Sequence, residues 1–261
     1  MTEYPTGIGT STVDEISLLG HNLADDLLGK VGFGELAIWL ATKKRPTAGQ
    51  VRVFEAVLVS LADHGFTPIA LAARLTYYSA PDSLQGAIAA GLLGGGSRFL
   101  GVTEDTGKFL HDALATLGDT IGWSEDQWDD AAREVVTGAK AAGIKIPGLG
   151  HPVHKNGDPR TPVIMSIARE EGQFGPHLEL FAAIGRVHSE ILGRTLPLNG
   201  AGVGGATLAD LGLPIDLLRG FALIARTAGL VGHLAEEKTH PIAPDIYMAV
   251  DRNAVYRPDM N

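Results

Sequence analysis

The chain has 261 residues, 45% of them hydrophobic, and a formal net charge of −9 at pH 7. This length allows a folded protein with a sizeable core, and the acidic balance argues against a general nucleic-acid binder, which would carry a basic patch. Because the sequence contains no cysteine, disulfides, thiolate nucleophiles and cysteine-based metal sites are excluded.

Hydrophobic spacing predicts helices along almost the whole chain, and therefore an all-α fold. One amphipathic helix is expected to begin near Ala48, and Ser124 with Gln127 forms a capping-box pattern before a segment closed by Gly143. Glycine and proline separate the other expected helices, which lie at 14–29, 34–42, 69–79, 83–93, 104–117, 160–172, 177–193, 203–212 and 214–237.

We treat residues 1–261 as one domain, and a smaller helical lobe within about 120–215 is an open alternative. The first ten residues lack the basic and apolar regions of a secretory signal. The apolar segment 217–235 is interrupted by Arg219 and Arg226, which makes it a poor membrane span. We therefore expect a soluble cytoplasmic protein that binds neither membrane nor nucleic acid.

The 34 glycines are informative, since glycine inside a helix costs roughly 1 kcal/mol against alanine. Gly200, Gly202 and Gly205 satisfy the spacing of a dinucleotide-binding fingerprint. That fingerprint needs a buried strand before it, whereas the preceding sequence reads as a helix end and a proline turn. Close approach of helices to one another or to a ligand explains the cluster better.

The segment GLGHPVHKNGDPR at 148–160 places an imidazole and a guanidinium in one glycine-rich loop. Glycines before His151 let the backbone approach a ligand, the imidazole can exchange a proton near neutral pH, and Arg160 can grip a carboxylate with two parallel hydrogen bonds. We interpret the segment as an active-site loop. A polar surface turn is the alternative.

Other side chains indicate a chemical role less specifically. His151 and His154 are spaced as two metal ligands can be, but Pro152 lies between them and no carboxylate triad is obvious, so we predict no metal site. His64, at the end of a predicted helix, is either a partner of the helix dipole or a site residue. Arg226 interrupts an apolar helix and, because a buried arginine is costly unless paired, should meet a carboxylate side chain or an anionic ligand.

Taken together, five motifs resemble the citrate synthase superfamily, and most closely the short citryl-CoA lyases and the citryl-CoA lyase module of ATP-citrate lyase. Their order and spacing make the set specific. The motifs are ADHG at 62–65, GLLGGGSRFLG at 91–101, PGLGHPVHKNGDPR at 147–160, LN at 198–199 before a glycine-rich helix start, and ARTAGLVGH at 225–233.

This resemblance implies the short form of a citrate synthase-like helical fold, a homodimer or higher homo-oligomer, and a site for citryl-CoA or a similar hydroxyacyl-CoA. His64 would bind a substrate carboxylate or carbonyl, and His151 would act as base on the tertiary hydroxyl. The carbon–carbon bond would then break in a retro-Claisen cleavage, giving a ketoacid such as oxaloacetate and the enolate of acetyl-CoA.

The same resemblance assigns the remaining site residues. Coenzyme A would arrive as part of the substrate, with no permanently bound cofactor. The residues expected to hold the acyl part are Arg160, Arg226 and Asn199, with the backbone near Gly148 and Gly150 close to the thioester. The candidates for phosphate contacts are Arg98, Lys145, Lys155 and Arg257.

Two departures from the family pattern stand out. This chain reads LLGGG where full-length citrate synthases have a histidine, which favours a lyase over a synthase. The lyases also carry an aspartate that exchanges the α-proton with the enolate, and here Ala201 stands in its place. Losing such a group costs roughly 10²–10⁴-fold in rate. Asp245 and Asp63 are the candidate substitutes.

Three functions remain open on the sequence alone. The favoured one is cleavage of citryl-CoA or a related 3-hydroxy-3-carboxyacyl-CoA with rerouted proton delivery. The second is a different acyl-CoA lyase or hydrolase on the same scaffold, because alanine at position 201 enlarges the pocket and removes a charge. The third is a non-catalytic binder of CoA thioesters or a partner subunit.

Overall fold

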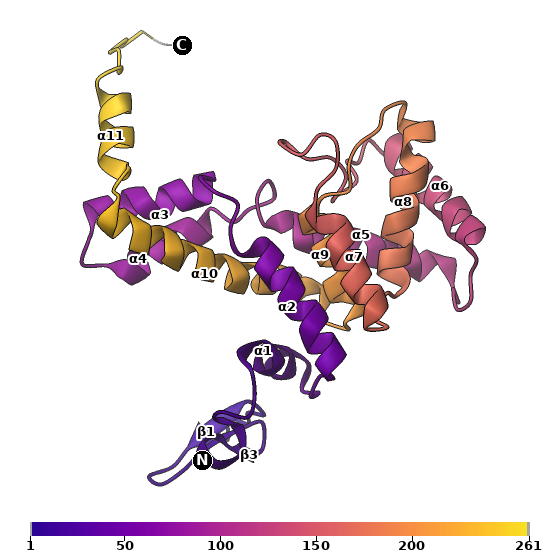
Figure 1. Ribbon diagram of the computed structural model, residues 1–261, viewed down its shortest axis with the longest axis horizontal. Helices are drawn as coiled ribbons and strands as arrows, with labels where there is room; N and C mark the ends of the chain where they lie inside the picture. The colour runs from indigo at the N-terminus through magenta and orange to yellow at the C-terminus, as the bar shows by residue number, and fades with distance from the viewer. Residues whose placement is uncertain (1, 260–261) are drawn as a thin grey trace.

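The computed structural model, which describes residues 2–259, is built almost wholly of helices (Figure 1), so the predicted all-α fold is confirmed. The helices are α1 (Phe33–Thr42), α2 (Ala48–Ala62), α3 (Pro68–Ser79), α4 (Leu84–Leu93), α5 (Gly101–Leu117), α6 (Glu125–Ala141), α7 (Arg160–Glu170), α8 (Pro176–Leu192), α9 (Gly200–Asp210), the short η2 (Ile215–Leu217), α10 (Leu218–Thr239) and α11 (Ala243–Asp251).

The helix predicted over 14–29 is wrong. This segment instead contributes to a small antiparallel sheet, of order β1-β2-β3, followed by the short π-helical turn η1 (Leu23–Leu27). Leu19 and Gly20, with φ of 54° and 81°, form the two-residue turn between β2 and β3. Such a turn suits a tight hairpin. The positive φ angles of these two residues interrupt the helix that the hydrophobic spacing predicted. The strands are β1 (Gly9–Ser11), β2 (Ile16–Leu18) and β3 (His21–Asn22).

Two helix starts follow directly from local sequence. Ser124 accepts a hydrogen bond from the backbone N–H of Gln127, whose side chain accepts from the backbone of Ser124, so the predicted capping box is confirmed. The same reciprocal pair, Thr47 and Gln50, starts α2 at Ala48. These caps fix where two helices enter the core.

The glycine cluster serves close packing around α9, which is buried along most of its length. A Cβ on Gly205 would lie 2.0 Å from the backbone oxygen of Thr103 in α5, and a Cβ on Gly202 would lie 2.5 Å from the Cα of Gly148. No side chain fits at those separations. The interpretation of the cluster as a packing device is therefore confirmed.

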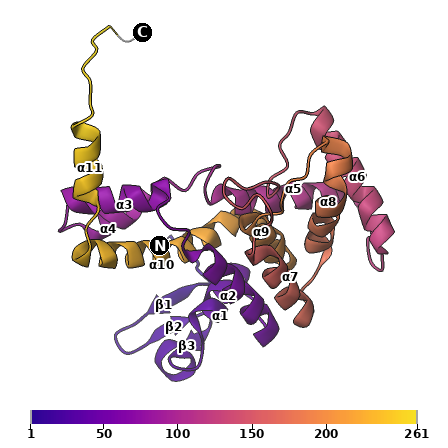
Figure 2. The same cartoon turned by 45° about the horizontal axis from the view of Figure 1, so that its top comes forward.

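The helices are arranged around a centre formed by α2, α5 and α9 (Figures 1 and 2). Helices α6 and α8 lie at one end and α3 and α4 at the other, with the long α10 running between the centre and the second end. The smaller lobe within 120–215 stays a prediction. No helix formed within residues 2–259 combines the length and apolar character needed to cross a bilayer.

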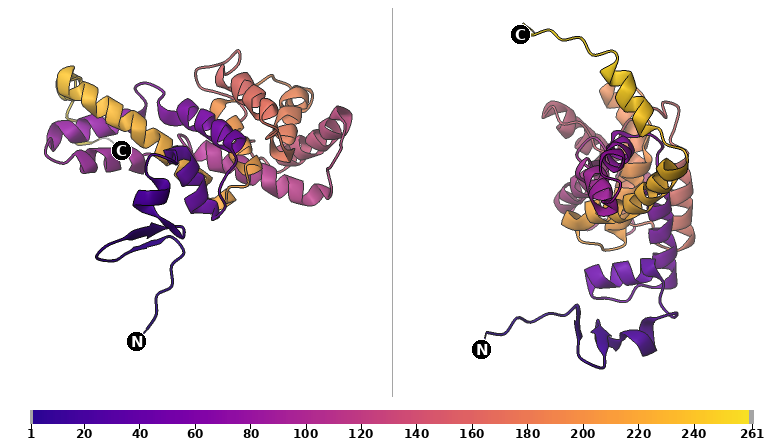
Figure 3. Two further views of the ribbon diagram at one scale, coloured as in Figure 1. Left: turned by 60° about the horizontal axis from the view of Figure 1, so that its bottom comes forward. Right: turned by 90° about the vertical axis from the view of Figure 1, so that its left-hand side faces the viewer.

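Helix α11, which the sequence analysis did not predict, starts against α3 and projects outward from the end of α10 (Figures 1 and 3). Its first turn is held by Glu237, whose carboxylate accepts hydrogen bonds from the backbone N–H groups of Ile242 (3.0 Å) and Ala243 (2.9 Å). A buried glutamate on α10 thus supplies the cap that the local sequence of α11 lacks.

We predict that Gly205→Ala destabilises the protein by about 2 kcal/mol or more, because the added methyl group must push α5 and α9 apart. Gly232→Ala is the matched control, since a Cβ there meets nothing within 4 Å and alanine favours the helix by up to about 1 kcal/mol. Urea denaturation measures both. Equal stability of the two variants would contradict the packing interpretation.

Candidate active site

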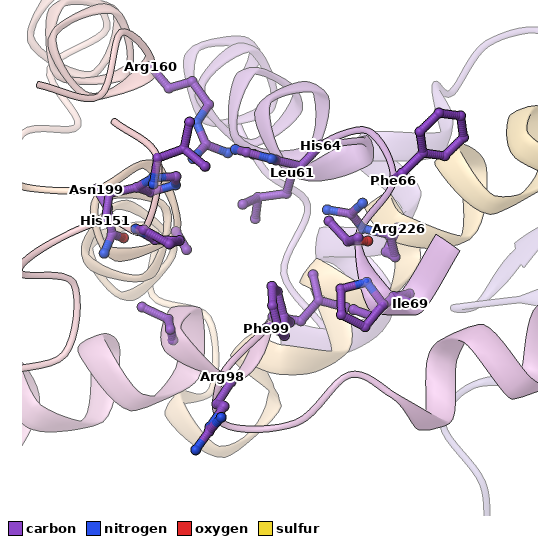
Figure 4. Close-up of a pocket in the computed structure, with 17 residues that line it drawn as sticks. Leu61, His64, Phe66, Ile69, Arg98, Phe99, His151, Arg160, Asn199 and Arg226 are labelled. Atoms are coloured by element: carbon purple, nitrogen blue, oxygen red, sulfur yellow. The ribbon is translucent and has the colours of Figure 1, made fainter. Parts of the chain in front are cut away.

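A cavity of about 420 Å³ opens between the central helices and collects most of the predicted site residues. Figure 4 shows their side chains arranged around one open space. The polar part of the lining consists of His64, Thr67, Arg98, His151, Arg160, Asn199 and Arg226. The apolar part consists of Leu61, Phe66, Pro68, Ile69, Phe99, Leu100, Ala201 and Val102, with Pro152 and Val153.

The cavity is electropositive although the chain as a whole is acidic. Four helices of the described chain, α3, α5, α7 and α9, have residues of their first turn in the lining, so their positive dipole ends face one space. Three arginines add to this, and within residues 2–259 the lining contains no aspartate or glutamate. Such a cavity favours an anionic ligand.

Arg226 gives the most direct sign of a missing partner. Arg226 is 5% exposed, and its Nε and one terminal nitrogen are buried without a hydrogen-bond partner among residues 2–259. Its nearest carboxylate oxygen, on Asp63, lies 3.6 Å away. Burial lowers the pKa of Arg226, against the attraction of Asp63. A buried guanidinium with free donors is costly, so the site is suited to a carboxylate that takes them.

Arg160, by contrast, is already held by the protein. Its Nε and one terminal nitrogen donate to Asp158 at 2.9 and 2.7 Å, and the other terminal nitrogen donates to the backbone oxygen of Ser60 at 3.0 Å. The guanidinium lies against Gly200, where a Cβ would come 2.3 Å from Nε. Asp158 therefore orients Arg160 and leaves it fewer donors for a ligand.

Asp158, which the sequence reading did not single out, is a buried carboxylate that also accepts the backbone N–H of Gly200 at 2.7 Å. Burial alone would raise the pKa of Asp158, but the hydrogen bonds from Arg160 and Gly200 outweigh it and hold the pKa well below its ordinary value. The sequence signal that could have identified Asp158 is the Asp-Pro-Arg tripeptide, which places a carboxylate two residues before Arg160, the first residue of α7.

The hydrogen bonds of His151 fix its tautomer. Nδ1 accepts the backbone N–H groups of Val153 (3.0 Å) and His154 (2.9 Å), so in the neutral ring the proton is on Nε2. Burial and the nearby imidazole of His154 lower the pKa of His151, which favours the neutral form of the ring. In this tautomer His151 can donate a hydrogen bond from Nε2, while Nδ1 is engaged by two backbone N–H groups.

Three imidazoles gather beside the cavity. The ring centroid of His64 lies 5.5 Å from that of His151 and 5.6 Å from that of His154, and one nitrogen from each ring falls within 4.8 Å of the others. This geometry is compatible with a metal. However, a metal-bound histidine usually donates from its second nitrogen, and in His151 that nitrogen accepts. The prediction of no metal therefore stays a prediction.

Asn199, Gly148 and Gly150 support the site through the backbone. The side chain of Asn199 caps α9 by accepting the N–H of Gly202 at 2.8 Å and donates to the backbone oxygen of Gly150 at 2.7 Å. Gly148 and Gly150 have φ of 81° and 93°, and Gly148 packs its backbone on Gly202. These residues tie the His151 loop to α9, and their contact with a substrate stays a prediction.

Of the remaining candidates in the described chain, Arg98 alone lines the cavity. Lys145 and Lys155 are exposed and do not line it, whereas Arg98 does, on the loop before α5. Arg257 follows α11 at the exposed C-terminal end of the described chain. Asp245 lies in α11 and Asp63 beside His64, and neither contributes to the lining.

Comparison with known proteins gives the same family as the motifs. A family model described as Citrate synthase, C-terminal domain, matches residues 20–248. A citrate synthase from Deinococcus radiodurans is 29% identical over 210 residues, which cover 76% of this chain and 50% of the relative. The ATP-citrate synthase beta chain protein 2 of Arabidopsis thaliana is 26% identical over 225 residues, which cover 79% and 34%. The chain thus spans half or less of these curated relatives.

Solved structures match over nearly the whole chain. A citryl-CoA lyase from Hydrogenobacter thermophilus has a TM-score of 0.84 and 30% identity, covering 99% of this chain and 96% of its own. An Asp-to-Ala mutant of Methanosaeta concilii ATP citrate lyase, in complex with (3S)-citryl-CoA, has a TM-score of 0.74 and 25% identity, covering 99% of this chain and 42% of its own. The predicted resemblance and fold are confirmed.

We predict that Asp158→Asn destabilises the protein by about 3 kcal/mol at pH 7, because it leaves the Arg160 guanidinium without its buried partner. Since the pKa of Asp158 is lower in the folded than in the unfolded protein, its ionised form stabilises above about pH 4, and this contribution is lost as the pH falls through the folded value. The difference between wild type and variant should therefore be constant above about pH 5 and shrink in acid.

Urea denaturation across this pH range measures the difference. Asp130→Asn is the control, because Asp130 is 78% exposed and its surface pair with Arg133 contributes at most about 1 kcal/mol. A difference for Asp158→Asn that grows in acid, or that matches the control at pH 7, would contradict the assigned role.

Proposed function

The chain belongs to the citrate synthase family, and on this basis we propose that it is a carbon–carbon lyase of the citryl-CoA type. Its substrate would be (S)-citryl-CoA or a related 3-hydroxy-3-carboxyacyl-CoA, cleaved to acetyl-CoA or another acyl-CoA and a ketoacid such as oxaloacetate. The main support for this proposal is Arg226, a buried guanidinium with unpaired donors. It lines the same cavity as His64, His151 and Arg160, and no carboxylate of the described chain lines that cavity.

The charges of such a substrate match those of the cavity. Citryl-CoA has two free carboxylates and a hydroxyl at one end. Arg226 offers the free donors for one carboxylate, and the outer donors of Arg160 with the helix N-termini serve the other. Coenzyme A enters as part of the substrate, and Arg98 at the cavity wall is placed for an anionic group of it.

The tautomer of His151 supports a role that differs from the predicted one. A ring that donates from Nε2 stabilises the negative charge that develops on the substrate's hydroxyl oxygen. It does not act as the base, because accepting the proton at Nδ1 would break two hydrogen bonds to the backbone. His64 lies 5.5 Å away between ring centroids and is the remaining group in the lining that can accept the hydroxyl proton.

The proposed reaction then balances with His64 alone as proton carrier. His64 takes the hydroxyl proton, the C–O bond becomes a carbonyl, and the adjacent carbon–carbon bond breaks with its electron pair moving to the acyl thioester as an enolate. His64 returns the proton to the enolate carbon, which gives the acyl-CoA and the ketoacid. His151 holds the oxygen by hydrogen bond throughout.

Ala201 and the apolar wall favour a second candidate. Ala201 lines the cavity where the family resemblance expects an aspartate, and Phe66, Phe99 and Leu100 line it too. A site without that carboxylate suits a bulkier or more apolar acyl group, so a different acyl-CoA lyase or hydrolase is the alternative, followed by a non-catalytic thioester binder. The homo-oligomeric state and the cytoplasmic location stay predictions.

We predict that the purified protein releases oxaloacetate from (S)-citryl-CoA and that His151→Ala slows this release by about 10²–10³-fold, because a hydrogen-bond donor to the developing charge is lost. Release is followed by coupled oxidation of NADH. His111→Ala, an exposed histidine outside the cavity lining, is the control and should keep wild-type activity. Absence of release, or release that is unaffected by His151→Ala, would reject the citryl-CoA proposal.

We further predict that Ala201→Asp accelerates citryl-CoA cleavage by at least about 10²-fold, since it adds a carboxyl group, able to act as acid and base, to a lining that has no carboxylate within residues 2–259. The same coupled assay measures it, with Ala201→Asn as the control of equal size and no charge. An unchanged or lower rate for Ala201→Asp would favour the second candidate, and a screen of acyl-CoA thioesters would then identify the substrate.

A further inference from the structure

We propose that His233 is a positioning residue that restrains the carboxylate of Asp63 and so keeps the guanidinium of Arg226 available for a ligand. Neither His233 nor Asp63 lines the cavity. The sequence motifs predicted no role for His233. The proposal rests on the proposed function only in that Arg226 takes a ligand carboxylate.

Asp63 is the nearest carboxylate to Arg226, yet it does not pair closely with it. Its Oδ1 accepts a hydrogen bond from Nε2 of His233 at 2.8 Å, whereas the nearest Arg226 nitrogen is 3.6 Å from the same oxygen. Its Oδ2 accepts the backbone N–H of Gly65 at 2.8 Å. Both oxygens are therefore engaged, and a movement of about 1 Å would bring the carboxylate into hydrogen-bond distance of Arg226.

His233 is itself fixed from its other side. Arg74, whose side chain is fully buried, donates from Nε to Nδ1 of His233 at 3.2 Å. Nδ1 is therefore an acceptor, and the proton that His233 donates to Asp63 is on Nε2. The ring cannot rotate to release Asp63 without leaving a buried arginine nitrogen unpaired.

Arg74 is anchored in turn by two glutamates at the end of α10. One terminal nitrogen pairs with the buried carboxylate of Glu237 at 2.8 Å, and the other pairs with Glu236. The guanidinium also lies 5.2 Å from the ring centroid of Phe66, which lines the cavity. Hydrogen bonds thus connect the start of α11, capped by Glu237, through the buried Arg74 and His233 to Asp63 at the edge of the site.

The physical consequence concerns competition for Arg226. If His233 released Asp63, this carboxylate would compete with the ligand's carboxylate for the donors of Arg226. The affinity of the site for the ligand would then fall, because Asp63 would neutralise the guanidinium. With His233 in place, Asp63 stabilises the positive charge from 3.6 Å without occupying the donors. The residue acts through its neighbour and needs no contact with substrate.

The test compares three variants by calorimetric titration with oxaloacetate, the proposed ketoacid product. His233→Phe keeps a ring of similar size but removes both nitrogens, and we expect its dissociation constant to rise at least tenfold. His233→Gln retains an N–H donor toward Asp63 and should stay within about threefold of wild type. Adding Asp63→Asn to His233→Phe removes the competing charge and should restore affinity to within about threefold.

A merely structural role predicts the opposite sign for the double variant, because removing a second network member would weaken binding further. Affinity in the double variant equal to or below that of His233→Phe would therefore overturn the proposal, as would unchanged affinity in His233→Phe. Thermal unfolding of each variant without ligand separates loss of folding from loss of binding.

A ligand-free crystal structure of His233→Phe provides the second measurement. We expect the Asp63 carboxylate within hydrogen-bond distance of the Arg226 guanidinium, and a carboxylate still 3.5 Å or more away would overturn the proposal. If wild-type protein does not bind oxaloacetate, the proposed substrate is wrong, while the crystal structure still decides whether His233 restrains Asp63.

Discussion

The structure depends on concentrating positive charge inside an acidic protein. Arg226 is buried with donors that no group in residues 2–259 satisfies, and the cavity it lines is also lined by first-turn residues of four helices. Unpaired buried charge is costly, so the fold must supply this free energy from its packing. Such a site gains most by binding an anion, and the proposed carboxylate ligand follows from this requirement.

Close helix packing provides both the free energy that offsets the buried charge and the geometry of the cavity. Helices α5 and α9 approach so closely that the position of Gly205 admits no side chain, and the loop before His151 packs backbone to backbone on Gly202. This contact brings the first turns of neighbouring helices to the same cavity wall. The glycines lower the intrinsic stability of the helix, but they allow helix ends to approach one another more closely than bulkier residues would.

Carboxylates at the edge of the site orient the positive groups without neutralising the cavity. Asp158 holds Arg160 and the first turn of α9, and Asp63 stands 3.6 Å from Arg226 with both oxygens engaged elsewhere. Neither lines the cavity. The hydrogen bonds that fix these carboxylates also fix the tautomer and direction of the groups beside them, which is how a preorganised site avoids rearrangement when a ligand enters.

The sequence by itself determined the helical fold, the family and the residue types of the site, because periodic apolar spacing, capping pairs such as Ser124 with Gln127, and motif order are local properties of the chain. It missed the hairpin turn at Leu19 and Gly20, which overrides helical spacing. Only the tertiary structure decided which nitrogen of His151 carries the proton, that Asp158 already occupies Arg160, and that His233 holds Asp63. Those facts depend on hydrogen bonds between groups whose relative positions packing alone fixes, so no local pattern encodes them.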